Sequence, residues 1–351
     1  MASMVHTKAR PTIHEFALIR ALHRRHGRRP PSVIQGIGDD AAVVTSGADQ
    51  WTVLTTDLLT EGIHFDLRTA TMADIGFRAA AANLSDIAAM GGIPQYLLIA
   101  LAIPRTGTQH QVLQLYRGMM AACRPHKVGL IGGDTSASSG GWFLSITLIG
   151  MAPHRRALFR SGARIGDLLY VTGTIGDALA GLRLLNEPPP RVNRPTRNSV
   201  LSTRHRRFLI RRHLRPTARV AEGQWLNTHR FGTSAIDISD GLSGDLRHIC
   251  EESHVGVDLD LGALPLSPAC RAYAASRKLD PVGLALTGGE DYELLFTVSP
   301  RQRIQLERAA LKQGFSLTRI GEIHPFRFGI QAVSPHGLRQ RLTHTSYEHF
   351  S

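Results

Sequence analysis

Five short segments of the sequence place aspartates beside glycine, hydroxyl or amide residues. They are GIGDDAA at 36–42, TTD at 55–57, NLSD at 83–86, GGDT at 132–135 and DISDG at 237–241. Carboxylates with neighbouring hydroxyls are ligands for hard cations, and Mg²⁺ typically binds through one or two carboxylates together with the phosphates of a substrate. If the five segments converge in the fold, they predict a site that holds several Mg²⁺ ions and a nucleotide.

Each segment also has an ordinary structural interpretation. Gly-Asp-Asp is a common turn, Asp240 could cap a helix that starts at Leu242, and Asp86 could be a solvated acid. Two common phosphate-binding motifs are absent: there is no Gly-Lys dipeptide, hence no P-loop, and no GxGxxG. The segment at 36–42 places two aspartates where a pyrophosphate would lie in a dinucleotide fold, so a bound nucleotide would need metal to neutralise its charge.

Composition bounds the class of protein. The 351 residues include 41 Lys plus Arg against 28 Asp plus Glu, a formal net charge of +13, and 42% apolar residues. This predicts a globular protein of two domains or one large one, excludes a disulfide scaffold, and favours weak attraction to polyanions, including nucleotides. No apolar run approaches the roughly 18 residues of a membrane span. The cysteines Cys123, Cys250 and Cys270 lack metal-binding spacing, so we expect a cytoplasmic protein.

Hydrophobic periodicity predicts the elements that must position the five segments. Strands are expected at 51–56, 96–103, 142–149, 168–172, 234–238 and 293–298. Helices are expected at 72–90, 109–123, 176–185 and 242–252. TTD then ends a strand, NLSD lies on a helix, DISDG joins a strand to a helix, and GGDT is expected as a glycine turn. The restart of the pattern after a boundary near 152–165 predicts an α+β fold of two mixed α/β-type domains.

We divide the chain into an N-terminal extension and helix (1–30), a first domain (31–152), a second domain (153–330) and a tail (331–351). The basic, acid-poor start has the composition of a transit peptide, but a helical run at 14–26 continues into the domain and argues against one. Within the second domain, residues 186–221 carry ten arginines. We interpret this segment as a solvated, partly mobile connection. A nucleic-acid arm is disfavoured because aromatic residues for base stacking are nearly absent.

Eight motifs in a fixed order make the sequence similar to a known family. They are GIGDDAA, TTDLLTEGIHF, NLSDIAAMGG, GGDTS, RALFRSGA, RRHLRP, DISDGLSGDL and GGEDYEL, over residues 36–297. They resemble the thiamine-monophosphate kinase family, within the superfamily that includes aminoimidazole-ribonucleotide synthetase. The resemblance implies two α/β domains of that type, a first domain that pairs across a homodimer, and an ATP site with several Mg²⁺ ions between the domains. It implies phosphorylation of thiamine monophosphate to thiamine diphosphate with ATP.

The same resemblance implies roles for individual residues. Metal ligands would be Asp40, Thr55, Thr56, Asp57, Asp86, Asp134, Asp237 and Asp240. Contacts to ATP would come from Tyr116, Gly133, Arg160 and Ser239, and contacts to the thiamine end of the substrate from His64, Glu290 and Tyr347. The tail around Tyr347, SYEHF, departs from the family's usual Gly, aromatic, Asp, His, Phe ending at two positions.

The implied substrate brings its own nucleophile, because a phosphomonoester with a second pKa of about 6 is largely anionic at neutral pH. No general base is therefore expected among the residues. The site must instead suppress repulsion between two polyanions and align the attacking oxygen, and clustered Mg²⁺ on carboxylates performs both tasks.

Two alternatives stay open. Another ATP enzyme of the same superfamily, such as a cyclising ligase of purine synthesis or selenophosphate synthetase, would share such a metal site. The latter expects a reactive Cys or selenocysteine close to the N-terminus, and the first cysteine here is Cys123. A non-catalytic nucleic-acid-binding or scaffold protein would use the arginine-rich segment, but it has no use for clustered carboxylates.

Overall fold

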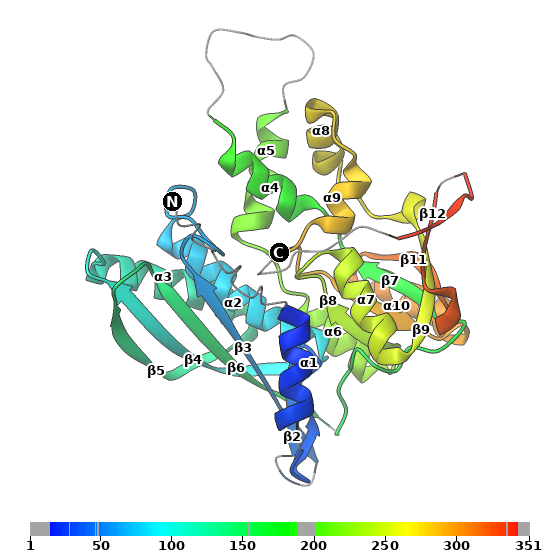
Figure 1. The fold of residues 1–351 in the computed structure, drawn as a ribbon, viewed down its shortest axis with the longest axis horizontal. Helices are drawn as coiled ribbons and strands as arrows, with labels where there is room; N and C mark the ends of the chain where they lie inside the picture. Colours follow the sequence, from blue (N-terminus) through cyan, green and yellow to red (C-terminus); the bar gives the residue numbers. More distant parts are fainter. Residues whose placement is uncertain are drawn as a thin grey trace, which may run out of the picture.

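Two mixed β-sheets with associated helices make up the structure (Figure 1). The computed structural model describes residues 15–27, 29–45, 47, 49–153, 155–188, 201–334 and 336–342. All strands of the first sheet precede residue 154, and all strands of the second follow it. The expected α+β class with two mixed α/β-type sheets is confirmed.

The first sheet has the strand order β1-β2-β3-β6-β4-β5. Its strands are β1 (Val33–Gln35), β2 (Ala42–Thr45), β3 (Gln50–Thr60), β4 (Ile93–Pro104), β5 (Gly129–Ser138) and β6 (Phe143–Pro153). Paired neighbours are antiparallel except β4 and β5, which are parallel. Buried residues alternate with more exposed ones along β3 and β6. This pattern is typical of a sheet with one covered face and one open face.

Helix α2 (Met72–Ala89) covers β3 and β6, and α3 (Gln109–Cys123) packs on α2. The two helices approach closely because glycines lie where they cross. A Cβ atom on Gly76 would lie 2.0 Å from the carbonyl oxygen of Leu115, and one on Gly118 would lie 1.8 Å from that of Ala73. Any larger residue would push the helices apart. The close packing therefore fixes α2 over the sheet.

The second sheet has the strand order β13-β12-β9-β11-β7-β10-β8. Its strands are β7 (Leu168–Thr172), β8 (Gly232–Asp237), β9 (Val255–Asp260), β10 (Leu294–Val298), β11 (Leu317–Pro325), β12 (Ile330–Val333) and β13 (Arg339–Arg341). Every residue of β7 and β10 is buried, as expected from their continuous apolar runs. The last two strands lie within the segment that we expected as a tail.

The other helices are α1 (Glu15–His26), α4 (Asp177–Asn186), α5 (Thr203–Leu214), α6 (Val220–Thr228), α7 (Leu242–Ser253), α8 (Pro268–Arg277), α9 (Pro281–Thr287) and α10 (Arg303–Gln313). Short 3₁₀ helices are η1 (Arg124–His126), η2 (Leu261–Ala263), η3 (Pro300–Gln302) and η4 (Phe326–Phe328). Within the described residues, no helix combines the length and the apolar character that crossing a bilayer requires.

Two sequence-based expectations were wrong. GGDT is not a turn, because it lies inside the edge strand β5, paired in parallel with β4. The arginine-rich segment is not simply a solvated connection, because its later part forms α5 and the start of α6. Ser202 caps α5 by accepting a hydrogen bond from the backbone of His205, and Leu209 and His213 are buried against neighbouring helices.

Candidate active site

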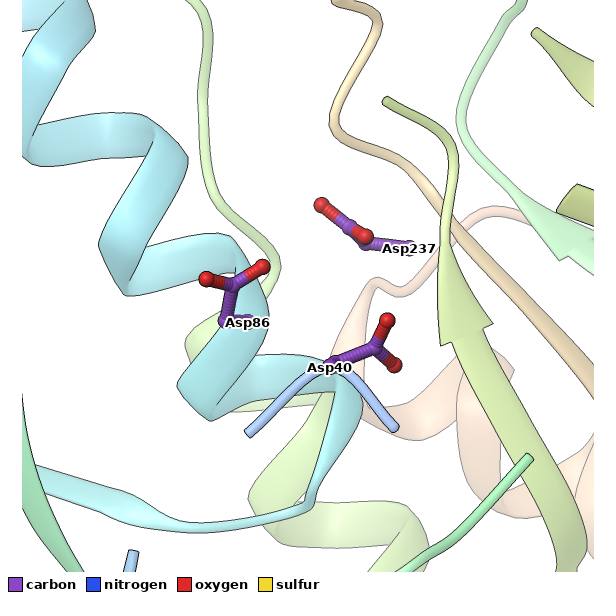
Figure 2. Close-up of side chains that lie close together, drawn as sticks. All are labelled: Asp40, Asp86 and Asp237. Atoms are coloured by element: carbon purple, nitrogen blue, oxygen red, sulfur yellow. The ribbon is translucent and has the colours of Figure 1, made fainter. Parts of the chain in front are cut away.

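Three aspartates from distant parts of the chain meet at one place. Asp40 lies just before β2, Asp86 lies on α2, and Asp237 ends β8. One carboxylate oxygen from each lies within 4.8 Å of the others. Figure 2 shows the three side chains around a common space. We call these three residues the aspartate triad.

The negative charge of the triad is not fully balanced by neighbouring cationic side chains, and the pKa values of its carboxyl groups show this. Burial raises the pKa of Asp86 well above its usual range, and the charges of Asp57 and Asp237 add to the effect. Burial and the neighbouring Asp40 raise the pKa of Asp237 to about 8, and burial raises that of Asp57 to about 6. Such raised values mean that the ionised cluster requires either protons or cations.

Among the described residues, two triad oxygens have no hydrogen-bond partner. Oδ2 of Asp40 and Oδ2 of Asp237 are buried and accept no hydrogen bond within the part of the chain described. Leaving such an atom unsatisfied is costly. Oxygen donors in this arrangement suit a hard divalent cation, so the residues present fit the Mg²⁺ ions that the sequence suggested.

Arg160 contacts one edge of the triad. Its Nε and Nη2 donate to Oδ1 of Asp40 at 3.1 and 2.5 Å, and its backbone N–H donates to Oδ2 of Asp39 at 3.3 Å. Burial, together with the charge of Asp40, raises the pKa of Asp39 to about 8. One guanidinium therefore faces a group of carboxylates that also includes Asp86 and Asp237.

A cleft of about 1090 Å³ opens beside the triad. Its lining includes Asp57, His64, Ser239, Asp240 and Glu290. These five residues were all expected at the site from the sequence. Two backbone hydrogen bonds join the segments that carry Ser239 and Glu290: Glu290 N–H donates to the carbonyl oxygen of Ser239 at 2.8 Å, and Tyr292 N–H donates to that of Ile238 at 2.9 Å.

Comparison with known proteins agrees with this geometry. Residues 38–152 match the family model described as AIR synthase related protein, N-terminal domain. Thiamine-monophosphate kinase of Escherichia coli (strain K12) is 37% identical over 340 residues, which cover 96% of this chain and 98% of the relative. The chain belongs to the thiamine-monophosphate kinase family.

Solved structures of the family match over nearly the whole chain. A structure described as AaThiL complexed with AMPPCP and TMP has a TM-score of 0.82 and 32% identity, covering 98% of this chain and all of its own. Thiamine-monophosphate kinase from Stenotrophomonas maltophilia K279a has a TM-score of 0.73 and 37% identity, covering 92% of this chain and 97% of its own. The family resemblance therefore extends through both sheets.

The family's threonine pair lies on both faces of β3. Thr55 is buried on the face covered by α2, and its hydroxyl donates a hydrogen bond to Oδ2 of Asp86. Because side chains alternate along a strand, Thr56 points to the open face. There its hydroxyl accepts a hydrogen bond from that of Thr147 at 3.2 Å. Thr55 is thus a direct neighbour of the triad, and the side chain of Thr56 is not.

Asp134 and Gly133 lie on β5, at a distance from the aspartate triad of the same chain. One row of paired residues crosses the sheet from β3 to β5. It consists of Leu58, Ser145, Ala100 and Asp134. Three strand spacings separate the ends of this row, about 14 Å. Asp134 also shares the open face with Leu58. Gly133 is next to it, and a Cβ atom there would lie 2.0 Å from the carbonyl oxygen of Ile99.

The two expected aromatic contacts have different outcomes. Tyr116 lies on α3, half-buried against the hydrophobic core, and burial raises its pKa. It does not line the cleft described above. Tyr347 lies outside the described residues, so its substrate role stays a prediction.

Four functional-site neighbours were not expected from the sequence. Asp39 contacts the backbone of Arg160, and Asp245 accepts a hydrogen bond from Gly241 N–H at 3.1 Å. Arg78 and His213 contact Glu290. Asp39, Asp245 and His213 all lie inside motifs that carried the family resemblance, which was the available signal. Arg78 lies on the alanine-rich helix and had none.

Proposed function

We propose that this chain phosphorylates thiamine monophosphate to thiamine diphosphate with ATP as phosphoryl donor. The observation that carries the proposal is the aspartate triad, with two buried oxygens that lack a hydrogen-bond partner among the described residues, beside a cleft that Glu290 also lines. An anionic donor with its cations suits the triad, and a cationic ring suits the carboxylate of Glu290. The family relatives named thiamine-monophosphate kinase support the same reaction.

We infer that Asp40, Asp86 and Asp237 hold Mg²⁺, with Asp57 and Asp240 beside them. When bound, the ions supply positive charge that offsets repulsion between the two substrates and align the transferred group. The chain itself keeps the triad carboxylates in place: Thr55 donates to Asp86, and Arg160 donates to Asp40. No side chain has to remove a proton, because the acceptor phosphate is already ionised.

Burial makes the charge of Glu290 depend on Arg78 and His213. Burial opposes its ionisation, but Arg78 and His213 outweigh that effect and lower its pKa to about 2. Its side chain is 30% exposed and lines the cleft. A permanently charged carboxylate in this position can attract the thiazolium ring. His64 lies beside it, with Nδ1 accepting from Thr60 N–H at 3.0 Å.

We propose that two copies pair through the open face of the first sheet. Large apolar side chains on this face are exposed: Leu58 by 57%, Tyr96 by 46% and Phe143 by 39%. Contiguous exposed apolar residues on a sheet are typical of an interaction surface. Asp134 and Thr56 lie on the same face, so a second copy would bury them.

The proposed dimer can be tested by placing negatively charged residues on the open face of the first sheet. Tyr96→Glu combined with Phe143→Glu should convert the protein to monomers in sedimentation experiments. Leu311→Glu is the matched control, because Leu311 is 80% exposed on α10. A double variant that still sediments as a dimer would place the interface elsewhere.

We also propose a cytoplasmic location. Cys123, Cys250 and Cys270 are all free and buried. Unpaired cysteines are typical of proteins from reducing compartments.

One assay tests the reaction. Purified protein is incubated with ATP, Mg²⁺ and thiamine monophosphate, and thiamine diphosphate is measured directly. We expect product in proportion to enzyme and none when a chelator removes the metal. Replacing thiamine monophosphate by the substrates of other ATP enzymes in the superfamily should give no turnover. Absence of thiamine diphosphate with all components present would overturn the proposed function.

A further inference from the structure

The loop that carries Glu290 has an unusual backbone. Glu290 and Tyr292 have φ values of 64° and 52°, in the left-handed region that non-glycine residues seldom adopt. Such conformations persist only where surrounding contacts enforce them. Part of that enforcement comes from the backbone hydrogen bonds to Ser239 and Ile238 described above. The side chain of Glu290 has further contacts with Arg78 and His213.

Two buried side chains support the Glu290 carboxylate from beneath. Arg78 on α2 is 4% exposed, and its Nη1 lies 3.2 Å from Oε2 of Glu290. His213 on α5 is 5% exposed, and its Nδ1 lies 3.1 Å from the same oxygen. Arg78 also donates to the carbonyl oxygen of His64. One arginine thus contacts two of the three residues expected at the thiamine end, His64 and Glu290.

The contact between the two supporting residues fixes the histidine tautomer. Arg78 Nη1 lies 2.8 Å from Nε2 of His213. A guanidinium has no acceptor, so Nε2 must accept and the ring proton of a neutral His213 resides on Nδ1. The Nδ1 side of the ring faces Oε2 of Glu290 at 3.1 Å, as a close polar contact and not as an aligned hydrogen bond. Both supports therefore act on Oε2, and neither contacts Oε1.

We propose that Arg78 and His213 are positioning residues that hold Glu290 with Oε1 directed into the cleft, to receive the cationic ring of thiamine monophosphate. This inference rests on the proposed function. It also gives a role to the RRHLRP motif, in which His213 is the histidine. Neither residue needs to touch substrate, because each acts through the orientation and charge of Glu290.

The geometry of His213 allows a graded test. His213→Asn keeps an amide donor near the Nδ1 position, whereas His213→Gln keeps a group near Nε2 and loses the donor to Glu290. We expect His213→Gln and His213→Leu to raise KM for thiamine monophosphate about ten-fold, because each removes the polar contact that faces the charged Glu290. KM for ATP and kcat should stay within two-fold. His213→Asn should recover most of the affinity.

Arg215→Leu is the matched control. Arg215 lies just beyond α5 and also contacts α2, since its Nε lies 2.7 Å from Oδ1 of Asp74, but it does not contact Glu290. Its loss should leave KM for thiamine monophosphate unchanged. Thermal midpoints are measured for every variant. Arg78→Lys, which keeps the charge but cannot span three acceptors, provides a second route to the same result if the His213 variants fail to fold.

A double-mutant cycle separates positioning from a structural role. In the background Glu290→Gln, the effect of His213→Leu on KM should shrink to less than two-fold, because the group through which it acts is gone. An unchanged ten-fold effect in that background, or equal rises in KM for ATP, would overturn the inference. Wild-type protein without any thiamine diphosphate formation would instead overturn the proposed function, so the two failures are distinguishable.

Discussion

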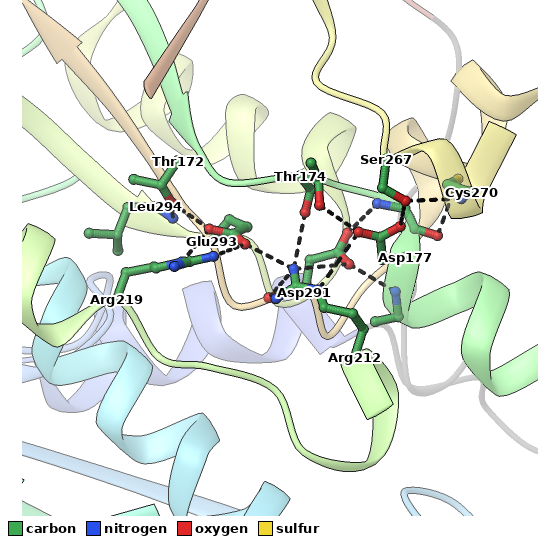
Figure 3. Close-up of polar contacts among 12 residues, drawn as sticks. Thr172, Thr174, Asp177, Arg212, Arg219, Ser267, Cys270, Asp291, Glu293 and Leu294 are labelled. Atoms are coloured by element: carbon green, nitrogen blue, oxygen red, sulfur yellow. Dashed lines mark hydrogen bonds and ion pairs between the residues drawn. The ribbon is translucent and has the colours of Figure 1, made fainter. Parts of the chain in front are cut away.

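Two groups of buried carboxylates in this molecule contain similar residues in different electrostatic surroundings. The aspartate triad has Arg160 at one edge and unpartnered oxygens on Asp40 and Asp237. The second group, which we call the ionic network, contains the acids Asp177, Asp291 and Glu293 and the bases Arg212 and Arg219 (Figure 3). Its carboxylates meet cations that the chain itself supplies.

Contacts in the ionic network are dense. Arg219 Nε and Nη2 donate to the two oxygens of Glu293 at 2.5 and 2.6 Å, and Arg212 Nη2 donates to the same carboxylate at 2.9 Å. Asp291 accepts from the backbone N–H groups of Gly176 and Ala178 at 2.5 and 2.9 Å, at the start of α4. These bonds join the arginine-rich segment to the second sheet.

The contrast distinguishes a structural cluster of acids from a functional one. Where the chain supplies arginines together with backbone and hydroxyl donors, hydrogen bonds satisfy the acids and the group holds elements together. Where it leaves buried oxygens without donors among the described residues, the missing positive charge can come from a bound cation, as we propose for the triad. Counting acids alone would rank the two groups equally.

The largest expected effect comes from the triad. Asp86→Asn removes one charge from the proposed metal-binding group at nearly constant volume, so we expect turnover to fall about 10³-fold. Asp57→Asn should act in the same direction. Because burial of Asp86 as a charged group is costly, stability without metal should not fall. Turnover is measured as thiamine diphosphate formed, and stability by thermal unfolding in a chelator.

Asp280→Asn is the matched control for that prediction. Asp280 caps α9 through hydrogen bonds to Val282 and Gly283, a role that asparagine also fills. It should retain full activity. Unimpaired turnover in Asp86→Asn would show that the triad does not hold a required ion.

For the ionic network we expect the opposite result, namely a loss of stability without a loss of turnover. Arg219→Met removes the guanidinium that donates two hydrogen bonds to the buried Glu293. We therefore expect the free energy of unfolding to fall by about 3 kcal/mol. Arg219→Lys should lie between, because lysine cannot form the bidentate pair. The kcat of the folded fraction should stay near that of the wild type. Denaturant unfolding at fixed pH measures the loss.

An Arg219→Met variant with normal stability but impaired turnover would erase the distinction between the two groups. It would mean that the network acts in the reaction and not in holding the fold.

Much of the fold could be predicted from local pattern. The helix expected at 109–123 coincides with α3, and the strand expected at 168–172 coincides with β7. Strand β5 escaped prediction because Gly129–Ser138 is polar, glycine-rich and exposed along most of its length. Its strand state depends on pairing with β4, which lies 25 or more residues earlier. Helix α5 was not predicted from the sequence because most of its residues are polar or charged. Its buried residues are Leu209 and His213.

In the site, too, some residues could be predicted from the sequence and others depend on long-range packing. Family motifs predicted Asp40, Asp86 and Asp237, which the fold brings together. Strand alternation in TTD could have separated Thr55 from Thr56 without a structure. No local signal could have paired Arg78 with Glu290, because they lie 212 residues apart and meet only through packing of α2 against the second half of the chain.

The smallest expected effect is a pH dependence of stability that metal reverses. Folding raises the pKa of Asp57 to about 6 and that of Asp237 to about 8 from an ordinary value near 3.8. Raised carboxyl pKa values give stability that is fully present below the ordinary value and is lost as pH rises through the folded value. In a chelator, the thermal midpoint should therefore fall between about pH 4 and pH 8, by a few degrees.

Asp291 in the ionic network has a pKa raised by burial to about 7, so it contributes a loss of the same sign. Metal separates the two groups. Mg²⁺ should displace protons from the triad and restore the midpoint at pH 8, while it has no site in the network, whose acids are already paired. Asp237→Asn should remove the part of the pH dependence that Mg²⁺ reverses and leave the remainder. If Mg²⁺ changes the midpoint of Asp237→Asn as much as that of the wild type, the ion binds elsewhere, and the contrast between the two carboxylate groups fails.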